Sequence, residues 1–280
     1  MIREIAGRQN HSVKLAHKLQ KKKHRRERGL LVGDGLDLLE IAVQAGADVR
    51  DVLVRRDLLK QLPRSLVERA EAGALDIGVC DDDVLAAATS LGGAADVVFT
   101  CKEPGWSLGD VDLQTGLIAF LDEVGDPGNV GTLVRSGVAF GAAGLVCSPG
   151  TADPYGPKAM RAGMGAQFLL PVVLEVSAQD LMARLRKLRG RADRPAQVVV
   201  ADSRGGDDVR TLGGDTVGGV VLVLGAERRG PGEQWDGARR VCISQERFDS
   251  LNVAMAGTIL LYELSRAKRG GKETAGSLGP

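Results

Sequence analysis

Polar residues and a glycine follow three apolar runs in this chain, and their types suit the binding and orientation of a small molecule. Asn129 and Arg135 come after the first run, Gly225 closes the second, and Ser250 and Asn252 open the third, which is helical. Amide, hydroxyl and guanidinium groups hold ligands by hydrogen bonds, and strand ends in α/β folds are common places for them. The three junctions together predict one composite binding site.

The positions of the histidines and cysteines exclude several kinds of enzyme. All three histidines lie among the first 24 residues, so the rest of the chain has no imidazole base or ligand. This excludes a Ser-His-Asp hydrolase or a His-rich metal centre in the C-terminal part. The four cysteines lack metal-ligand spacing and are expected to be free thiols. We therefore predict no metal. A Walker loop and a dinucleotide-binding fingerprint are also absent.

The composition indicates a water-soluble globular protein of one or two domains. The chain has 280 residues, of which 44% are hydrophobic and 26% charged. No apolar run approaches the roughly 20 residues that span a bilayer, and the first residues do not resemble a signal peptide. We expect a cytoplasmic protein with no membrane segment.

Positive charge is concentrated at the N-terminus although the whole chain carries a net charge of only +1. Residues 1–28 contain ten lysines and arginines against two glutamates. A basic block of this kind favours contact with a phosphate backbone, and the alternative is a solvated helix face. We expect one helix over 12–28, capped by Ser12. The candidate residues for this phosphate contact, which would bind the nucleic acid, are Lys14, Lys18, Lys21, Lys22, Lys23, Arg25 and Arg26.

Strands alternate with helices along the chain, which predicts an α/β fold. The expected domains are 1–105, a Pro- and Gly-containing linker at 106–115, a second domain at 116–268 and a flexible tail at 269–280. In the second domain the pattern predicts strands at 116–122, 144–147, 171–174, 198–201, 220–224 and 241–243, and helices at 130–140, 156–163, 177–189 and 250–266.

Taken together, the three junctions resemble motifs 1, 2 and 3 of the SpoU/TrmH family of RNA 2′-O-ribose methyltransferases. The likeness covers roughly residues 116–266 and rests on Asn129 with Arg135, the Leu-Gly-x-Glu-x-x-Gly pattern at 224–230, and Ser-Leu-Asn at 250–252. It implies a Rossmann-like α/β-knot (trefoil knot, SPOUT) catalytic domain that uses S-adenosylmethionine. The N-terminal part, with its basic helix and Gly33-Asp34-Gly35, resembles the family's L30-like RNA substrate-binding domain.

The resemblance also implies roles for individual residues. Arg135 would orient a phosphate and stabilise the developing alkoxide, Asn129 would fix Arg135, and Glu227 would position Arg135 or the ribose. Arg228 after that glutamate, and Ser244 after Ile243, depart from the family pattern of Gly and Pro. The implied catalytic residues are Asn129, Arg135, Glu227, Ser250 and Asn252. The implied cofactor-binding residues are Leu224, Gly225, Ala226, Gly230, Ile243, Leu251 and Asn252.

The same resemblance implies partners. The extra basic domain favours a large folded RNA, so we expect 23S rRNA as the substrate. The length and architecture are also similar to those of the methyltransferases with which antibiotic producers protect their ribosomes. A homodimer through the last helix is implied. The alternatives are a tRNA methyltransferase, a non-catalytic RNA-binding protein of ribosome assembly, and a nucleotide-dependent metabolic enzyme.

Overall fold

The chain folds into two compact units. A computed structural model describes residues 1–89, 95–189, 196–212, 218–226, 230, 232–246 and 250–276, with side chains up to Arg269. Unit 1 contains Met1–Pro104 and Tyr155–Leu169, and unit 2 contains Gly105–Pro154 and Leu170–Pro280. Glu227, one of the implied catalytic residues, lies outside the described residues.

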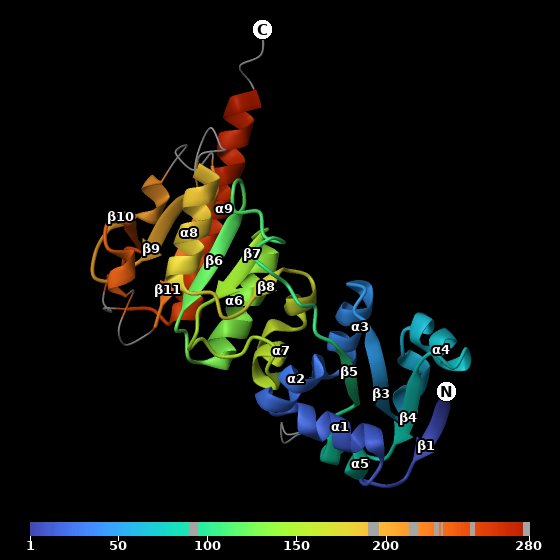
Figure 1. Ribbon diagram of the computed structural model, residues 1–280. Coiled ribbons are helices and arrows are strands. Elements are labelled where there is room, and N and C mark those ends of the chain that lie inside the picture. Colours follow the sequence, from blue (N-terminus) through green and yellow to red (C-terminus); the bar gives the residue numbers. More distant parts are fainter. Residues whose placement is uncertain are drawn as a thin grey trace. The chain divides into compact units, whose positions relative to one another are not determined.

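Unit 1 is built on a five-stranded mixed sheet of order β1-β4-β3-β5-β2 (Figure 1). The strand β5 runs antiparallel to both β2 and β3, and the other pairs are parallel. Its strands are β1 (Ile2–Ile5), β2 (Leu30–Asp34), β3 (Val49–Arg55), β4 (Asp76–Cys80) and β5 (Val97–Lys102). Its helices are α1 (His11–Leu19), α2 (Lys22–Arg28), α3 (Leu36–Gln44), α4 (Arg64–Glu71), α5 (Asp82–Ala88) and α7 (Pro157–Gly163), with 3-10 turns η1 (Arg56–Gln61) and η2 (Ala166–Phe168).

The basic N-terminal segment forms two helices, so the prediction of one helix over 12–28 was wrong. The helix α1 ends at Leu19, and α2 starts again at Lys22. The cap of α1 is Asn10, whose side chain accepts a hydrogen bond from the backbone N–H of Ser12. Ser12 is instead buried and donates its hydroxyl to Asp51 at 2.9 Å. An asparagine cap two residues earlier therefore replaces the predicted serine cap.

Unit 2 is built on a seven-stranded parallel sheet of order β10-β12-β9-β11-β6-β7-β8. The strands are β6 (Leu117–Asp122), β7 (Gly144–Cys147), β8 (Val172–Val173), β9 (Gln197–Ala201), β10 (Asp207–Asp208), β11 (Val220–Gly225) and β12 (Arg239–Cys242). The helices are α6 (Pro127–Ala139), α8 (Ala178–Arg189) and α9 (Val253–Gly276), with 3-10 turns η3 (Val209–Thr211) and η5 (Glu233–Trp235). The central strands are apolar runs because both faces of a parallel sheet are covered.

Helices lie on both faces of the unit 2 sheet (Figure 1). The helix α8 packs Leu181 and Leu185 against Phe120 of β6 and its neighbours. On the other face α6 packs beside α9. A glycine permits this close approach, because a Cβ at Gly257 of α9 would lie 2.4 Å from Leu133 Cδ2 of α6.

Two segments differ from the sequence-based expectation. Tyr155–Leu169 lies within unit 1, although the pattern assigned it to the second domain. Residues expected to form a flexible tail from 269 continue α9 as far as Gly276, and 277–280 lie outside the described residues. The implied knot would involve residues 227–229 and 247–249, which are not among the described residues, so the knot stays a prediction.

The four cysteines are free, as expected, and three of them are buried. Burial raises the pKa of the Cys80 thiol to about 11 and that of Cys101 to about 12, so both stay protonated near neutral pH. Inert thiols of this kind fill space in a core. Among the described residues, no helix has the length and apolar character needed to cross a membrane.

Candidate functional site

A cavity of about 410 Å³ lies at the carboxyl ends of β9, β11 and β12. In open parallel sheets this edge is where ligands bind, because backbone N–H and C=O groups become free where strands end. All seven residues predicted to bind a cofactor line this cavity: Leu224, Gly225, Ala226, Gly230, Ile243, Leu251 and Asn252. Ser250, predicted to be catalytic, lines it as well. Their individual roles stay predictions.

Asn252 joins the first and third junctions through its side-chain amide. Its Nδ2 donates to Asn129 Oδ1 at 3.1 Å, although the two residues are 123 positions apart in the sequence. Its Oδ1 accepts from the backbone N–H groups of Ala254 and Met255, so Asn252 also caps α9. The last helix therefore starts at Val253, after Ser250, which the pattern had placed inside it. One side chain thus sets both the start of α9 and its link to α6.

The helix α6 presents the first junction. Asp126 caps it by accepting from the backbone N–H of Asn129 at 2.8 Å, and Pro127 occupies its first turn. Arg135 lies six residues beyond Asn129, which is about 9 Å along a helix. The Arg135 side chain is exposed, and it has no ion pair within the described part of the chain. It is not among the residues that line the cavity.

At the second junction a backbone hydrogen bond joins Ala226 and Gly230, the described residues on either side of 227–229. The backbone N–H of Gly230 donates to the C=O of Ala226 at 2.9 Å, and Gly230 has a φ of 69°, which favours glycine. The predicted catalytic Glu227 belongs to the residues between them, which lie outside the described part.

An acidic residue that the sequence analysis missed completes the cavity wall. Asp202 follows β9, is buried, and accepts hydrogen bonds from the backbone and side chain of Arg204 and from the Arg240 guanidinium. Burial alone would raise the pKa of Asp202, but these hydrogen bonds outweigh it and lower the pKa. Asp202 is therefore an anion near neutral pH. Its place directly after an apolar run was the signal that could have identified it.

The basic block of unit 1 exposes most of the predicted RNA-binding side chains. Lys14, Lys18, Lys21, Lys22, Lys23 and Arg26 are exposed on α1, α2 and the turn between them. Arg25 is a correction, because it is only 4% exposed and its guanidinium donates to the C=O groups of Leu19 and Gln20 at 2.8 and 3.0 Å. It satisfies the carbonyl end of α1, so we remove it from the residues that would contact RNA.

Two family models match the chain, one for each part of it. The SpoU rRNA Methylase family matches residues 116–262. An MRM3-like substrate binding domain matches residues 10–94. Together they reproduce the predicted order of a substrate-binding domain followed by a catalytic domain.

Similar proteins of known sequence span nearly the same length. A 23S rRNA (uridine(2479)-2′-O)-methyltransferase of Streptomyces viridochromogenes is 29% identical over 85% of this chain and 83% of its own. The 23S rRNA (guanosine(2553)-2′-O)-methyltransferase RlmP of Bacillus subtilis is 27% identical over 94% of this chain and 99% of its own.

Two solved structures are similar to this chain over nearly its whole length. The SpoU methyltransferase AviRb from Streptomyces viridochromogenes, in complex with the cofactor AdoMet, has a TM-score of 0.81 and 28% identity over 94% of this chain and 100% of its own. An AdoMet-bound rRNA methyltransferase from Sinorhizobium meliloti has a TM-score of 0.80 and 29% identity over 95% of this chain and 98% of its own.

Proposed function

Because the chain belongs to the SpoU rRNA methylase family, we propose that it transfers the methyl group of S-adenosylmethionine to a ribose 2′-hydroxyl of ribosomal RNA. The observation that carries this proposal is the cavity at the strand ends, which gathers residues from the second and third junctions. The Asn129–Asn252 hydrogen bond links the first junction to them. We favour 23S rRNA, on which the Streptomyces and Bacillus relatives act by name. A role in antibiotic self-resistance is a further hypothesis within this proposal.

The cavity suits S-adenosylmethionine in size and chemistry. Its volume of about 410 Å³ falls in the range of small-molecule sites. Leu224, Leu251 and Val253 offer apolar walls for an adenine ring, and Gly225 lets the ligand approach the backbone without a side chain between them. The bound donor would supply a methyl group already activated on a sulfonium.

The protein's own groups would then position the acceptor and stabilise its charge. Arg135 is a permanent cation that would hold the RNA phosphate and stabilise the alkoxide as the 2′-hydroxyl loses its proton. Asn129, fixed by Asn252, would hold the start of α6 in place. Ser250 would hydrogen-bond across the site, and Glu227 would position Arg135 or the ribose. A phosphate oxygen or a water would accept the proton.

Binding and transfer can be tested separately. Calorimetric titration with S-adenosylmethionine should give one site per chain, and purified 23S rRNA should then receive a methyl group on a single ribose. Folded protein that releases no heat would favour the non-catalytic assembly protein. Methylation of tRNA in preference to 23S rRNA would favour the tRNA alternative. Binding of a nicotinamide dinucleotide in place of the methyl donor would favour a metabolic enzyme.

We predict that Gly225→Val weakens S-adenosylmethionine binding by at least about tenfold, because three added carbons would enter the cavity wall. Gly225 does not have the positive φ that would strain a valine, so the fold should survive. Calorimetry measures the affinity, and circular dichroism checks the fold. Gly7→Val, at a glycine outside the cavity that also lacks a positive φ and has open space around a built Cβ, tests a general glycine effect. Undiminished binding by Gly225→Val would show that the donor binds elsewhere.

The basic block would hold the RNA. Changing Lys21, Lys22 and Lys23 to glutamine should lower the salt dependence of RNA binding by about two to three in log–log slope, because fewer counterions are released. Filter binding over a series of KCl concentrations measures the slope. The matched control changes Arg50, Lys60 and Arg64, which are exposed elsewhere on unit 1, to glutamine. Equal slopes for both triple variants would remove the basic block from the interface.

A homodimer is also part of the proposal. The helix α9 and the residues just before it expose an apolar stripe of Leu251, Met255, Ile259 and Tyr262. Met255 is 63% exposed. Apolar side chains at helical spacing favour burial against a partner. We expect sedimentation to show a dimer, and Ile259→Lys to shift it toward the monomer. A wild-type monomer at micromolar concentration would contradict this prediction.

Action on ribosomal RNA would place the protein in the cytoplasm.

A further inference from the structure

A second, larger pocket lies in unit 2 between α8 and the edge of the sheet. Its volume is about 730 Å³, and it shares no lining residue with the cavity described above. It opens at the first residues of β9, Gln197 and Val198, whereas Ala201 at the other end of β9 lines the first cavity. The two pockets therefore use opposite ends of the same strands, and nothing in the proposed methyl transfer uses the second one.

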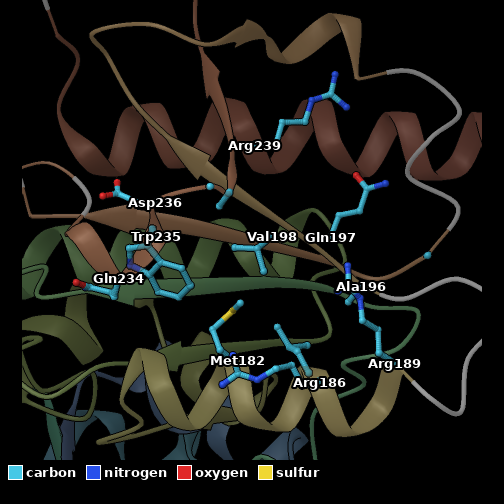
Figure 2. A pocket seen from close by; sticks show the side chains of 14 residues that line it. Met182, Arg186, Arg189, Ala196, Gln197, Val198, Gln234, Trp235, Asp236 and Arg239 are labelled. Carbon is cyan, nitrogen blue, oxygen red and sulfur yellow. The ribbon is translucent and has the colours of Figure 1, made fainter.

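The pocket floor is apolar and firmly held. Met182 reaches up from α8 toward Val198 and Trp235 (Figure 2). Trp235 is 1% exposed, its indole Nε1 donates to Asp122 at 2.8 Å, and its ring meets Phe120 edge to face at 5.2 Å. A wall fixed by a buried hydrogen bond and an aromatic contact keeps the pocket's shape without a ligand.

The pocket rim is positively charged. Arg186 and Arg189 rise from the last turns of α8, and Arg239 lies on the opposite side (Figure 2). Arg239 pairs with Asp207 at 2.8 Å. In the described part of the chain, no carboxylate pairs with Arg186 or Arg189, and both are exposed. Two guanidinium groups next to an apolar floor form a site for an anion that carries a flat apolar group.

We propose that this pocket binds a nucleotide, with the base against Met182, Val198 and Ala238 and the phosphate on Arg186 and Arg189. The volume exceeds what a phosphate ion would fill, and with an ion alone the apolar floor would stay in contact with water. The nucleotide is either free or one residue of an RNA strand, and the site does not depend on the proposed methyl transfer.

The test uses uridine and guanosine 5′-monophosphates as probes, because neither carries the adenine of the methyl donor. Calorimetry on the full chain should detect binding of at least one of them. Arg186→Glu with Arg189→Glu should weaken it by at least about tenfold, since both charge-assisted contacts are lost. The matched control, Arg184→Glu with Lys187→Glu, changes the same charge on the same helix outside the pocket and should have less than about a twofold effect.

A third variant tests the contribution of the apolar floor to binding independently of the arginine charges. Ala196→Leu keeps every arginine and fills part of the pocket, so it should also weaken nucleotide binding. Inorganic phosphate should bind far more weakly than the nucleotides. Equal binding of phosphate and nucleotide, or equal losses in the two double variants, would overturn the proposal because either result describes a plain basic surface.

A single-stranded decauridylate identifies the source of the nucleotide. Binding of the decamer that depends on Arg186 and Arg189, without binding of monophosphates, supports the site with RNA as its ligand. Binding of monophosphates supports a free nucleotide. Failure of both probes overturns the proposal. Donor binding and methyl transfer, measured on the same samples, report on the proposed enzyme separately, so a failure of one hypothesis does not count against the other.

Discussion

Arg135→Ala is expected to reduce methyl transfer to RNA by at least about a hundredfold, while the affinity for S-adenosylmethionine stays unchanged. The loss follows because a fixed cation opposite a developing oxyanion is commonly worth two to three powers of ten in rate. The affinity should survive because Arg135 is not part of the cavity wall. Single-turnover transfer of a labelled methyl group, with calorimetry alongside, measures both quantities.

Two further variants sharpen this experiment. Arg135→Lys keeps the charge but loses the planar fork, so it should recover only part of the activity. Arg184→Ala removes an exposed arginine of unit 2 that lines neither pocket, and it should transfer at the wild-type rate. Full activity of Arg135→Ala would refute the role assigned to this residue, and an equal loss in both alanine variants would indicate a general charge effect.

Gly257→Val is expected to lower the free energy of unfolding by about 3 kcal/mol or more. A Cβ at this position would lie 2.4 Å from Leu133 Cδ2 and 2.7 Å from Leu224 Cδ1. Both leucines are at most 1% exposed, so they cannot move into open space. Helix α9 would have to move away from α6 and β11, which would also disturb the Asn129–Asn252 hydrogen bond. Urea denaturation followed by circular dichroism measures the change.

Arg266→Val is the matched control for this prediction. It introduces the same β-branched side chain in the same helix, at a side chain that is 61% exposed and whose ion pair with Glu263 is a surface contact. We expect a loss below about 1 kcal/mol there. If the two valine variants were equally stable, the close packing of α9 would not depend on a glycine.

The central strands of unit 2 could be predicted from sequence because each is a continuous apolar run bounded by turn residues, whereas β10, made of Asp207 and Asp208, could not. The strand β7 matches its expected bounds of 144–147, and β11 begins at Val220 as expected. The site could be located for the same reason, since polar residues directly after such runs must lie at one edge of a parallel sheet. The link between Asn129 and Asn252 could not be predicted, because it depends on how α6 and α9 pack.

Other features depend on contacts that leave little trace in local sequence. The strand β1 has four residues, three of them exposed, and it exists because it pairs with β4, more than 70 positions away. The break between α1 and α2 contains no glycine or proline, and it is held by Arg25, a charged residue that the pattern indicated as exposed. Asp202 was missed because a single acidic residue after a strand is common in loops.

The placement of Tyr155–Leu169 has a consequence for how this protein can be divided. A fragment that stops at Pro104 would lack α7, so Asp34 would lose its pair with Arg161 at 3.0 Å. The complementary fragment would carry a stretch whose partners, such as Ile41 against Gly165, had been removed. Neither unit is contiguous in sequence, so limited proteolysis or grafting onto a relative must treat the first unit as two separate stretches of sequence that fold together.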